Sequence, residues 1–143
     1  METETISNKT YNLVGDIGAT NARFALVSPG SSEMESIQSL KCSDFEDIQS
    51  AILLYLSDHP DLEIQAACFA TAGTVHLELF KLANNHWVIS KKDVKNALKG
   101  VEVQWINDFT AQAFATTTLR DDDVIVINQG IVCLLYTSPS PRD

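Results

Sequence analysis

The sequence predicts an α/β fold built on a mixed sheet, which opens with an antiparallel meander of three strands and carries helices on both faces. Two observations support this prediction. Three β-favouring runs, separated by turn residues such as Gly, Asn and Ser, occupy residues 11–41. Strand-like and helix-like segments then alternate up to residues 124–127, which is the order typical of α/β layers.

The composition is ordinary for a globular domain, but the charge is strongly negative. The 143 residues are 45% hydrophobic and 20% charged, with a formal net charge of −9 and a pI near 4.6. This length suits one domain, or one domain and part of another. The negative charge argues against nucleic acid and anionic membranes as partners. A phosphate ligand would therefore be held by backbone amides and a metal rather than by a basic surface.

The cysteine and histidine residues show no metal-ligand spacing. Cys68 lies in an apolar run, which is typical of a cysteine that packs as a small buried hydrophobe. The sequence shows neither a secretory signal nor an apolar run approaching about 18 residues. The default expectation is therefore a cytoplasmic protein without a membrane partner.

The first two runs, residues 11–14 and 22–27, are expected to pair as a hairpin around a polar turn. The turn contains Gly15, Asp16, Gly18, Thr20 and Asn21. Free amides in a tight turn form a concave anion site, and glycine lets a phosphate approach the backbone. A carboxylate beside phosphates needs a cation between them, so Asp16 indicates Mg²⁺. The turn suits a nucleotide phosphate, while a plain hairpin whose Asp and Thr bond their own backbone stays open.

Residues 36–41 are expected to form the third strand, and a helix follows it. Ser43 and Glu46 have the spacing of a capping box at the start of that helix. Its apolar face repeats with helical spacing, at Phe45, Ile48, Ile52 and Tyr55. A polar segment with a proline, residues 58–61, ends the helix.

Further strands and helices complete the predicted sheet. Residues 64–72 are a continuous apolar run, which is typical of a parallel strand buried on both faces. Residues 77–82 are a weaker strand candidate, and Ser90 is expected to cap a second helix. Residues 101–106 alternate as a strand does, and the Ala- and Thr-rich residues 110–119 predict a third helix.

The tetrad Ile106-Asn107-Asp108-Phe109 lies at the predicted junction of a strand and a helix. In open α/β sheets, ligands bind beyond the carboxyl ends of the strands. Asp108 could accept the proton of a hydroxyl that attacks a phosphate, and Asn107 could hydrogen-bond a neighbouring hydroxyl. The alternative is that Asp108 only caps the following helix.

Four segments resemble those of the bacterial glucokinases, sugar kinases of the hexokinase-like and actin-like ATPase superfamily. Residues 15–23, Gly-Asp-Ile-Gly-Ala-Thr-Asn-Ala-Arg, are similar to the family's first phosphate motif, with Ala19 where the family usually has glycine. If that position needs a positive φ, alanine costs about 1–3 kcal/mol there. The tetrad at residues 106–109 is similar to the motif that carries the catalytic aspartate and a sugar-binding asparagine.

The other two resemblances concern the sugar-binding segments. Residues 68–73 look like the family's strand before such a segment, with Thr74 in place of the usual proline. Ala83 and Asn84, followed by Trp87, are similar to a Thr-Asn pair followed by the same tryptophan. The threonine is absent here.

The resemblance implies a ribonuclease-H-like (actin-like ATPase) domain and an ATP-dependent glucokinase, which uses Mg²⁺ and transfers the γ-phosphate of ATP to the 6-hydroxyl of glucose. Asp108 would be the general base, and glucose would contact Asn84, Asn107 and Asp108. Asp16 would hold Mg²⁺ through water. The implied phosphate contacts are Gly15, Asp16, Ile17, Gly18, Ala19 and Thr20.

The resemblance covers only the front of such an enzyme, because family members are longer and place further sugar ligands and the adenosine site downstream. It implies a small amino-terminal lobe at residues 11–107 and the start of a second lobe at 108–130. Residues 1–10 are expected to be a flexible leader. Residues 131–143 resemble a non-native read-through peptide, with a genuine short tail as the alternative. The fragment is expected to be inactive alone, and a homodimer is compatible with the full-length enzyme.

Two other functions stay open. Ala19, Thr74 and Ala83 depart from the family's pattern and favour a sugar-sensing or regulatory relative without turnover. Kinases for other hexoses or for acylated amino sugars share the same fold, and the residues that choose the substrate lie mostly downstream.

Overall fold

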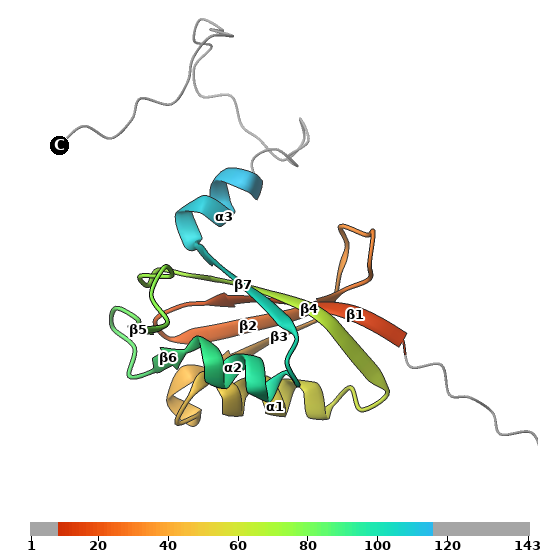
Figure 1. Ribbon diagram of the computed structural model, residues 1–143, viewed down its shortest axis with the longest axis horizontal. Coiled ribbons are helices and arrows are strands. Elements are labelled where there is room, and N and C mark those ends of the chain that lie inside the picture. Colours follow the sequence, from red (N-terminus) through yellow and green to blue (C-terminus); the bar gives the residue numbers. More distant parts are fainter. Residues whose placement is uncertain (1–8, 116–143) are drawn as a thin grey trace, which may run out of the picture.

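The computed structural model describes residues 9–115 of the chain, and its elements follow the predicted order, with a 3-10 turn and a short strand at residues 88–90 in addition (Figure 1). The opening meander consists of β1 (Lys9–Ile17), β2 (Asn21–Val27) and β3 (Met34–Lys41). A 3-10 turn, η1 (Cys42–Asp44), leads to α1 (Ile48–Ser57) and β4 (Leu62–Thr71). The chain continues through β5 (Leu79–Lys81), β6 (Val88–Ser90), α2 (Lys91–Ala97), β7 (Glu102–Asn107) and α3 (Asp108–Ala115).

The main sheet has five strands in the order β3-β2-β1-β4-β7. The first three strands pair antiparallel, whereas β4 lies parallel to both β1 and β7. Strands β5 and β6 form a separate two-stranded sheet. The predicted mixed sheet with an opening meander is therefore confirmed.

The parallel register brings three strand ends together. Asp16 in β1 is paired with Ala70 in β4, which in turn is paired with Ile106 in β7. Because β1, β4 and β7 run in the same direction, their carboxyl ends lie at one end of the sheet. The polar segments that follow β1 and β7 therefore start at the same end of the sheet, with β4 between them.

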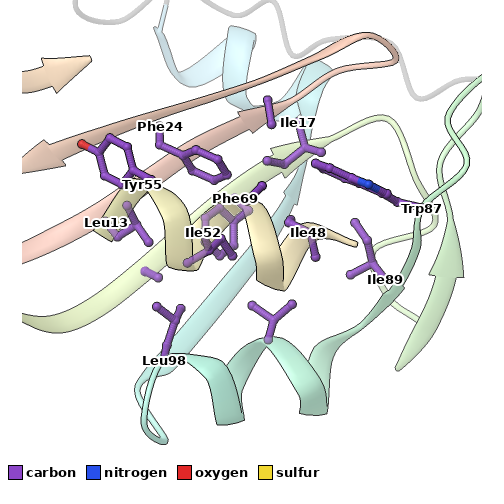
Figure 2. Packing of buried hydrophobic residues seen from close by; sticks show 14 of the residues in the cluster. Leu13, Ile17, Phe24, Ile48, Ile52, Tyr55, Phe69, Trp87, Ile89 and Leu98 are labelled. Carbon is purple, nitrogen blue, oxygen red and sulfur yellow. The ribbon is translucent and has the colours of Figure 1, made fainter. Parts of the chain in front are cut away.

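Helices α1 and α2 pack against one face of the sheet, and α3 lies at the end of β7 on the side away from them (Figure 1). The core between the helices and the sheet is rich in aromatic rings (Figure 2). The ring of Phe69 lies 6.2 Å from that of Phe24 and 5.1 Å from that of Trp105. On α1, the predicted apolar positions Ile48, Ile52 and Tyr55 are fully buried in this core.

Within residues 9–115, strand β4 is buried on one face only, so the predicted burial on both faces is not found in this part of the chain. Ala67, Phe69 and Thr71 point to the helices and are buried, whereas Cys68 and Ala70 on the other face are only half-buried. The reason is that α1 and α2 both pack on the same side of the sheet.

The start of α1 also differs from the prediction. Ser43 lies in η1, and the helix begins at Ile48 with Asp47 as its N-cap. The Asp47 carboxylate accepts hydrogen bonds from the backbone N–H and the hydroxyl of Ser50, at 2.8 and 2.7 Å. An aspartate next to the first buried turn therefore caps the helix in place of the predicted capping box. The predicted helix end and the Ser90 cap of α2 are confirmed.

Strand β3 starts at Met34 and contains a bulge. Two residues, Ser36 and Ile37, face the single residue Ala25 of β2, and Ser36 has a φ of +53°. The hydroxyl of Tyr55 on α1 donates a hydrogen bond to the carbonyl oxygen of Ser36 at 2.9 Å. This bond ties the first helix to the edge of the sheet.

Several predictions concern other parts of the chain. The strand at residues 124–127 and the tail at residues 131–143 lie outside the described residues. In the leader, Lys9 and Thr10 belong to β1. Among the described helices, none combines the length and apolar character that crossing a membrane would require.

Candidate functional site

The turn between β1 and β2 consists of Gly18, Ala19 and Thr20, and it is shorter than the sequence suggested because β1 continues to Ile17. The N–H of Gly18 is used within the hairpin, where it donates to the carbonyl oxygen of Asn21 at 2.9 Å. The N–H groups of Ala19 and Thr20 bond no other described residue. Two consecutive amides at an exposed turn can therefore bind an anion.

Ala19 has an ordinary backbone conformation. Among the described residues other than glycine, positive φ values occur only at Ser36, Asn84 and Lys99. The alanine that replaces the family's usual glycine is therefore not strained, and the cost considered for a positive φ does not arise.

The first two residues assigned to the turn, Gly15 and Asp16, lie within β1. Gly15 faces the core, where an added Cβ would lie 2.6 Å from a ring carbon of Phe69. Ile17 is also buried on this face, with 3% of its surface exposed. Both can offer a ligand only backbone atoms.

Asp16 is exposed on the opposite face of the sheet, next to the turn. Arg23 lies beside it across the hairpin, yet the carboxylate of Asp16 makes no ion pair or hydrogen bond with any described residue. Mg²⁺ keeps several waters and needs only one or two protein carboxylates. A single free carboxylate beside an anion-binding turn fits that requirement, although no cluster of three potential metal ligands occurs within residues 9–115.

Asn107 ends β7 and Asp108 begins α3. The side-chain oxygen of Asn107 and one carboxylate oxygen of Asp108 both accept from the N–H of Phe109, each at 2.9 Å. Asn107 therefore occupies the N-cap position of α3, the role considered for Asp108 on the sequence alone. Asp108 is half-buried, and its second oxygen bonds no described residue.

The two carboxylates lie at the same end of the sheet. Asp16 and Ile106 are separated by one strand, so their backbones are about 10 Å apart at strand spacings of about 4.8 Å. A cavity of about 640 Å³ lies at the opposite end, between the ends of α1 and α2, and none of the predicted site residues lines it. The candidate site is therefore the exposed carboxyl end of the parallel strands.

The third predicted segment also reaches this end. Asn84 is exposed and has a φ of +57°, which asparagine tolerates better than most residues. Its neighbour Asn85 donates from its side-chain nitrogen to the carbonyl oxygen of Gly18 at 3.1 Å. The segment with Asn84 therefore lies beside the turn that can bind an anion.

Contacts from outside the hairpin hold this arrangement together. The N–H of Cys42 donates to the carbonyl oxygen of Thr20 at 2.8 Å. The carbonyl oxygen of Phe45 accepts from the indole of Trp87 at 3.1 Å. Burial raises the pKa of the Cys42 thiol, so it stays protonated near neutral pH. The sequence had singled out Phe45 and Trp87, but not Cys42 or Asn85; the position of Asn85 between the two matched motif residues Asn84 and Trp87 was the available signal.

A hairpin turn with two free amides, a carboxylate at the end of a parallel strand two positions away in the sheet, and this strand order are features of the ribonuclease-H-like fold of the actin-like ATPases. A family profile described as Glucokinase matches residues 13–134. The chain therefore belongs to the glucokinase family.

Individual relatives agree with this assignment. A glucokinase of Hahella chejuensis is 42% identical over 125 residues, which are 87% of this chain and 39% of that protein. A glucokinase of Chromohalobacter salexigens is 38% identical over 82% of this chain and 37% of its own length. The crystal structure of a glucokinase from an Antarctic psychrotroph superposes with a TM-score of 0.75 at 33% identity, over 87% of this chain and 40% of that one. The chain thus spans about two fifths of these relatives.

Proposed function

We propose that the chain is the amino-terminal part of an ATP-dependent glucokinase, which transfers the γ-phosphate of ATP to the 6-hydroxyl of glucose. One observation carries this proposal: the anion-binding turn, the segment with Asn84 and the carboxylate of Asp108 all lie at one end of the sheet. Family membership supports glucose and ATP as the substrates, because the matching relatives are named glucokinases. Since ATP is the proposed donor, we also propose a cytoplasmic location.

The phosphates of ATP would bind the free amides of Ala19 and Thr20 and the hydroxyl of Thr20. Backbone atoms of residues 15–18, at the end of β1, would also contact the phosphates. Asp16 would hold Mg²⁺ through water, and the ion would neutralise charge on the phosphates. The exposed and unpaired carboxylate of Asp16 supports this role.

Asp108 would accept the proton of the sugar hydroxyl as its oxygen attacks phosphorus. One of its oxygens bonds the N–H of Phe109, which fixes the side chain, and the other is available to the hydroxyl. Asn107 uses its carbonyl oxygen on the same N–H, so its amide nitrogen remains to donate to the sugar. Asn84, exposed beside the turn, would provide another sugar contact.

Asp108→Asn tests the proposed base in a full-length form of the protein, extended to the length of its relatives. Removal of a general base lowers kcat by about 10²–10⁴-fold, whereas the KM for glucose should change little because asparagine keeps the shape of the side chain. Asp61→Asn is the control: it makes the same charge change at the opposite end of β4. An unchanged kcat in Asp108→Asn excludes the assignment.

The 143-residue chain itself is expected to show no kinase turnover. Transition-state stabilisation depends on preorganised groups around the transferred phosphate, and the chain spans only about two fifths of its relatives. A coupled assay for ADP release with glucose and ATP checks this expectation. Turnover by the purified chain would contradict it.

A sugar-binding relative without turnover is the second candidate, favoured by Thr74 and Ala83. Ala19 no longer supports it, because its backbone is unstrained. Calorimetry on the full-length protein separates the two functions, since a sensor would bind glucose without ADP release. The same titrations with other hexoses and with acylated amino sugars would identify a kinase of different specificity. A homodimer of the full-length enzyme is a further proposal, which sedimentation would test.

A further inference from the structure

The turn formed by Gly18, Ala19 and Thr20 is held mainly from outside the hairpin. The carbonyl oxygen of Thr20 accepts from the backbone of Cys42 at 2.8 Å. The carbonyl oxygen of Gly18 accepts from the side chain of Asn85 at 3.1 Å, across 67 positions of sequence. Of the residues described, Asn85 alone brings a side-chain nitrogen or oxygen to the turn. The Cys42 thiol also reaches the Gly18 carbonyl oxygen, at 3.8 Å, so the position of the two free amides depends on Asn85 together with Cys42.

Both ends of the Asn85 carboxamide are used. Its nitrogen donates to Gly18, and its oxygen accepts from the backbone N–H of Trp87 at 2.8 Å. Trp87 is fully buried, and its indole donates to the carbonyl oxygen of Phe45. The carbonyl oxygen of Gly18 can only accept a hydrogen bond, and the backbone N–H of Trp87 can only donate one. A side chain that both donates and accepts is therefore required to bridge them. One side chain thus links the turn to an anchored point of the core.

Asn85 also follows Asn84 directly, so the segment proposed to contact sugar and the turn proposed to hold phosphate meet at one residue. We infer that Asn85 is a positioning residue, which sets the phosphate-binding turn at a fixed distance from the sugar-binding segment. This inference rests on the proposed function. Productive transfer needs the hydroxyl oxygen and phosphorus within about 3–3.5 Å, and a misplacement of about 1 Å can cost roughly 100-fold in rate.

Asn85→Asp is the most informative variant. It keeps the size of the side chain and the oxygen that accepts from Trp87, but it replaces the nitrogen that donates to Gly18. His86→Ala is the matched control, because His86 is the next residue in the same segment. Its exposed ring lies 2.8 Å from the Phe45 carbonyl oxygen, which still accepts from Trp87, and packs edge-on against the Trp87 ring at 6.1 Å between centroids.

The first measurement uses the 143-residue chain and does not depend on activity. Amide nitrogen–proton NMR spectra should show shifted resonances for Gly18, Ala19 and Thr20 in Asn85→Asp, and nearly unchanged ones in His86→Ala. Thermal unfolding should occur at similar temperatures in both variants. If Asn85→Asp leaves the three resonances in place, the inference is wrong.

The second measurement is kinetic and uses a full-length form of the protein. Asn85→Asp should lower kcat by about 10- to 100-fold while the KM for glucose changes by less than about threefold. Asn85→Gln, which carries both functional groups, should recover part of the loss, and His86→Ala should be close to wild type. Equal losses in Asn85→Asp and His86→Ala would overturn the positioning role. An inactive wild-type protein would instead contradict the proposed function. The NMR result would then decide separately whether Asn85 positions the turn.

Discussion

At the scale of single residues, Gly15 shows how a motif residue can serve packing. It belongs to the segment that resembles a phosphate motif, and the sequence suggests that it lets a phosphate approach. In the structure its Cα faces the core between Phe24 and Phe69. The glycine makes room for two aromatic rings, while Gly18, Ala19 and Thr20 form the exposed turn.

Gly15→Ala should therefore lower stability. An added methyl would lie 2.6 Å from the Phe69 ring, and overpacking of this kind costs about 1–3 kcal/mol. Urea unfolding of the 143-residue chain measures the change in the free energy of unfolding. In a Phe69→Leu background the cost should shrink, because the obstructing ring is gone. Costs that simply add in the double variant would show that the ring is not responsible.

At the scale of elements, the start of α1 shows why helix ends are difficult to predict. Ser43 and Glu46 have the spacing of a capping box, but the structure places the cap at Asp47. Both are sound local signals, and the choice between them depends on where Ile48 meets the sheet. That position is fixed by the core, which the local sequence does not specify.

Asp47→Ala and Ser43→Ala form a direct comparison. Loss of the N-cap should lower the free energy of unfolding by about 0.5–2 kcal/mol, because the N–H of Ser50 loses its acceptor. Ser43→Ala should stay within about 0.5 kcal/mol, since its side chain caps no helix. Chemical denaturation of both variants tests this. A larger loss in Ser43→Ala would favour the capping box.

At the scale of the whole molecule, the sequence predicted the antiparallel meander, the alternation of strands and helices that follows it, and chemistry beyond the carboxyl ends of the strands. These features depend on periodicity and turn residues, which are local. It also placed Asp16, Asn84 and Asp108 in three separate segments, and the structure brings these segments to one end. The contacts that fix them, such as Asn85 with Gly18, join residues far apart in sequence and carry no local signal.

The stability of the molecule at high pH should depend on Tyr55. Burial raises the pKa of this tyrosine to about 12 in the folded chain, against about 10 when unfolded. The raised pKa contributes to the free energy of unfolding in full below about pH 10, and this contribution is lost as the pH rises through about 12. The reason is that the unfolded chain releases the tyrosine proton at a lower pH than the folded chain does.

Melting temperatures between pH 9 and pH 11 test this dependence. Wild type should lose stability more steeply than Tyr55→Phe, which cannot ionise. At neutral pH the variant should be less stable by about 1 kcal/mol, since the Ser36 carbonyl loses its hydrogen bond. Identical pH slopes for the two proteins would contradict the prediction.

The bulge at Ser36 has a consequence for how copies of the chain meet. Strand β3 lies at one edge of the sheet and exposes Met34 and Ile37, at 60% and 65% of their surfaces. A straight edge with such side chains would be a template for intermolecular strand addition and fibril growth. The positive φ of Ser36 and the extra residue break the regular spacing of donors and acceptors along that edge. A second copy could match only a few positions, so we expect the bulge to oppose polymerisation of the chain through this edge.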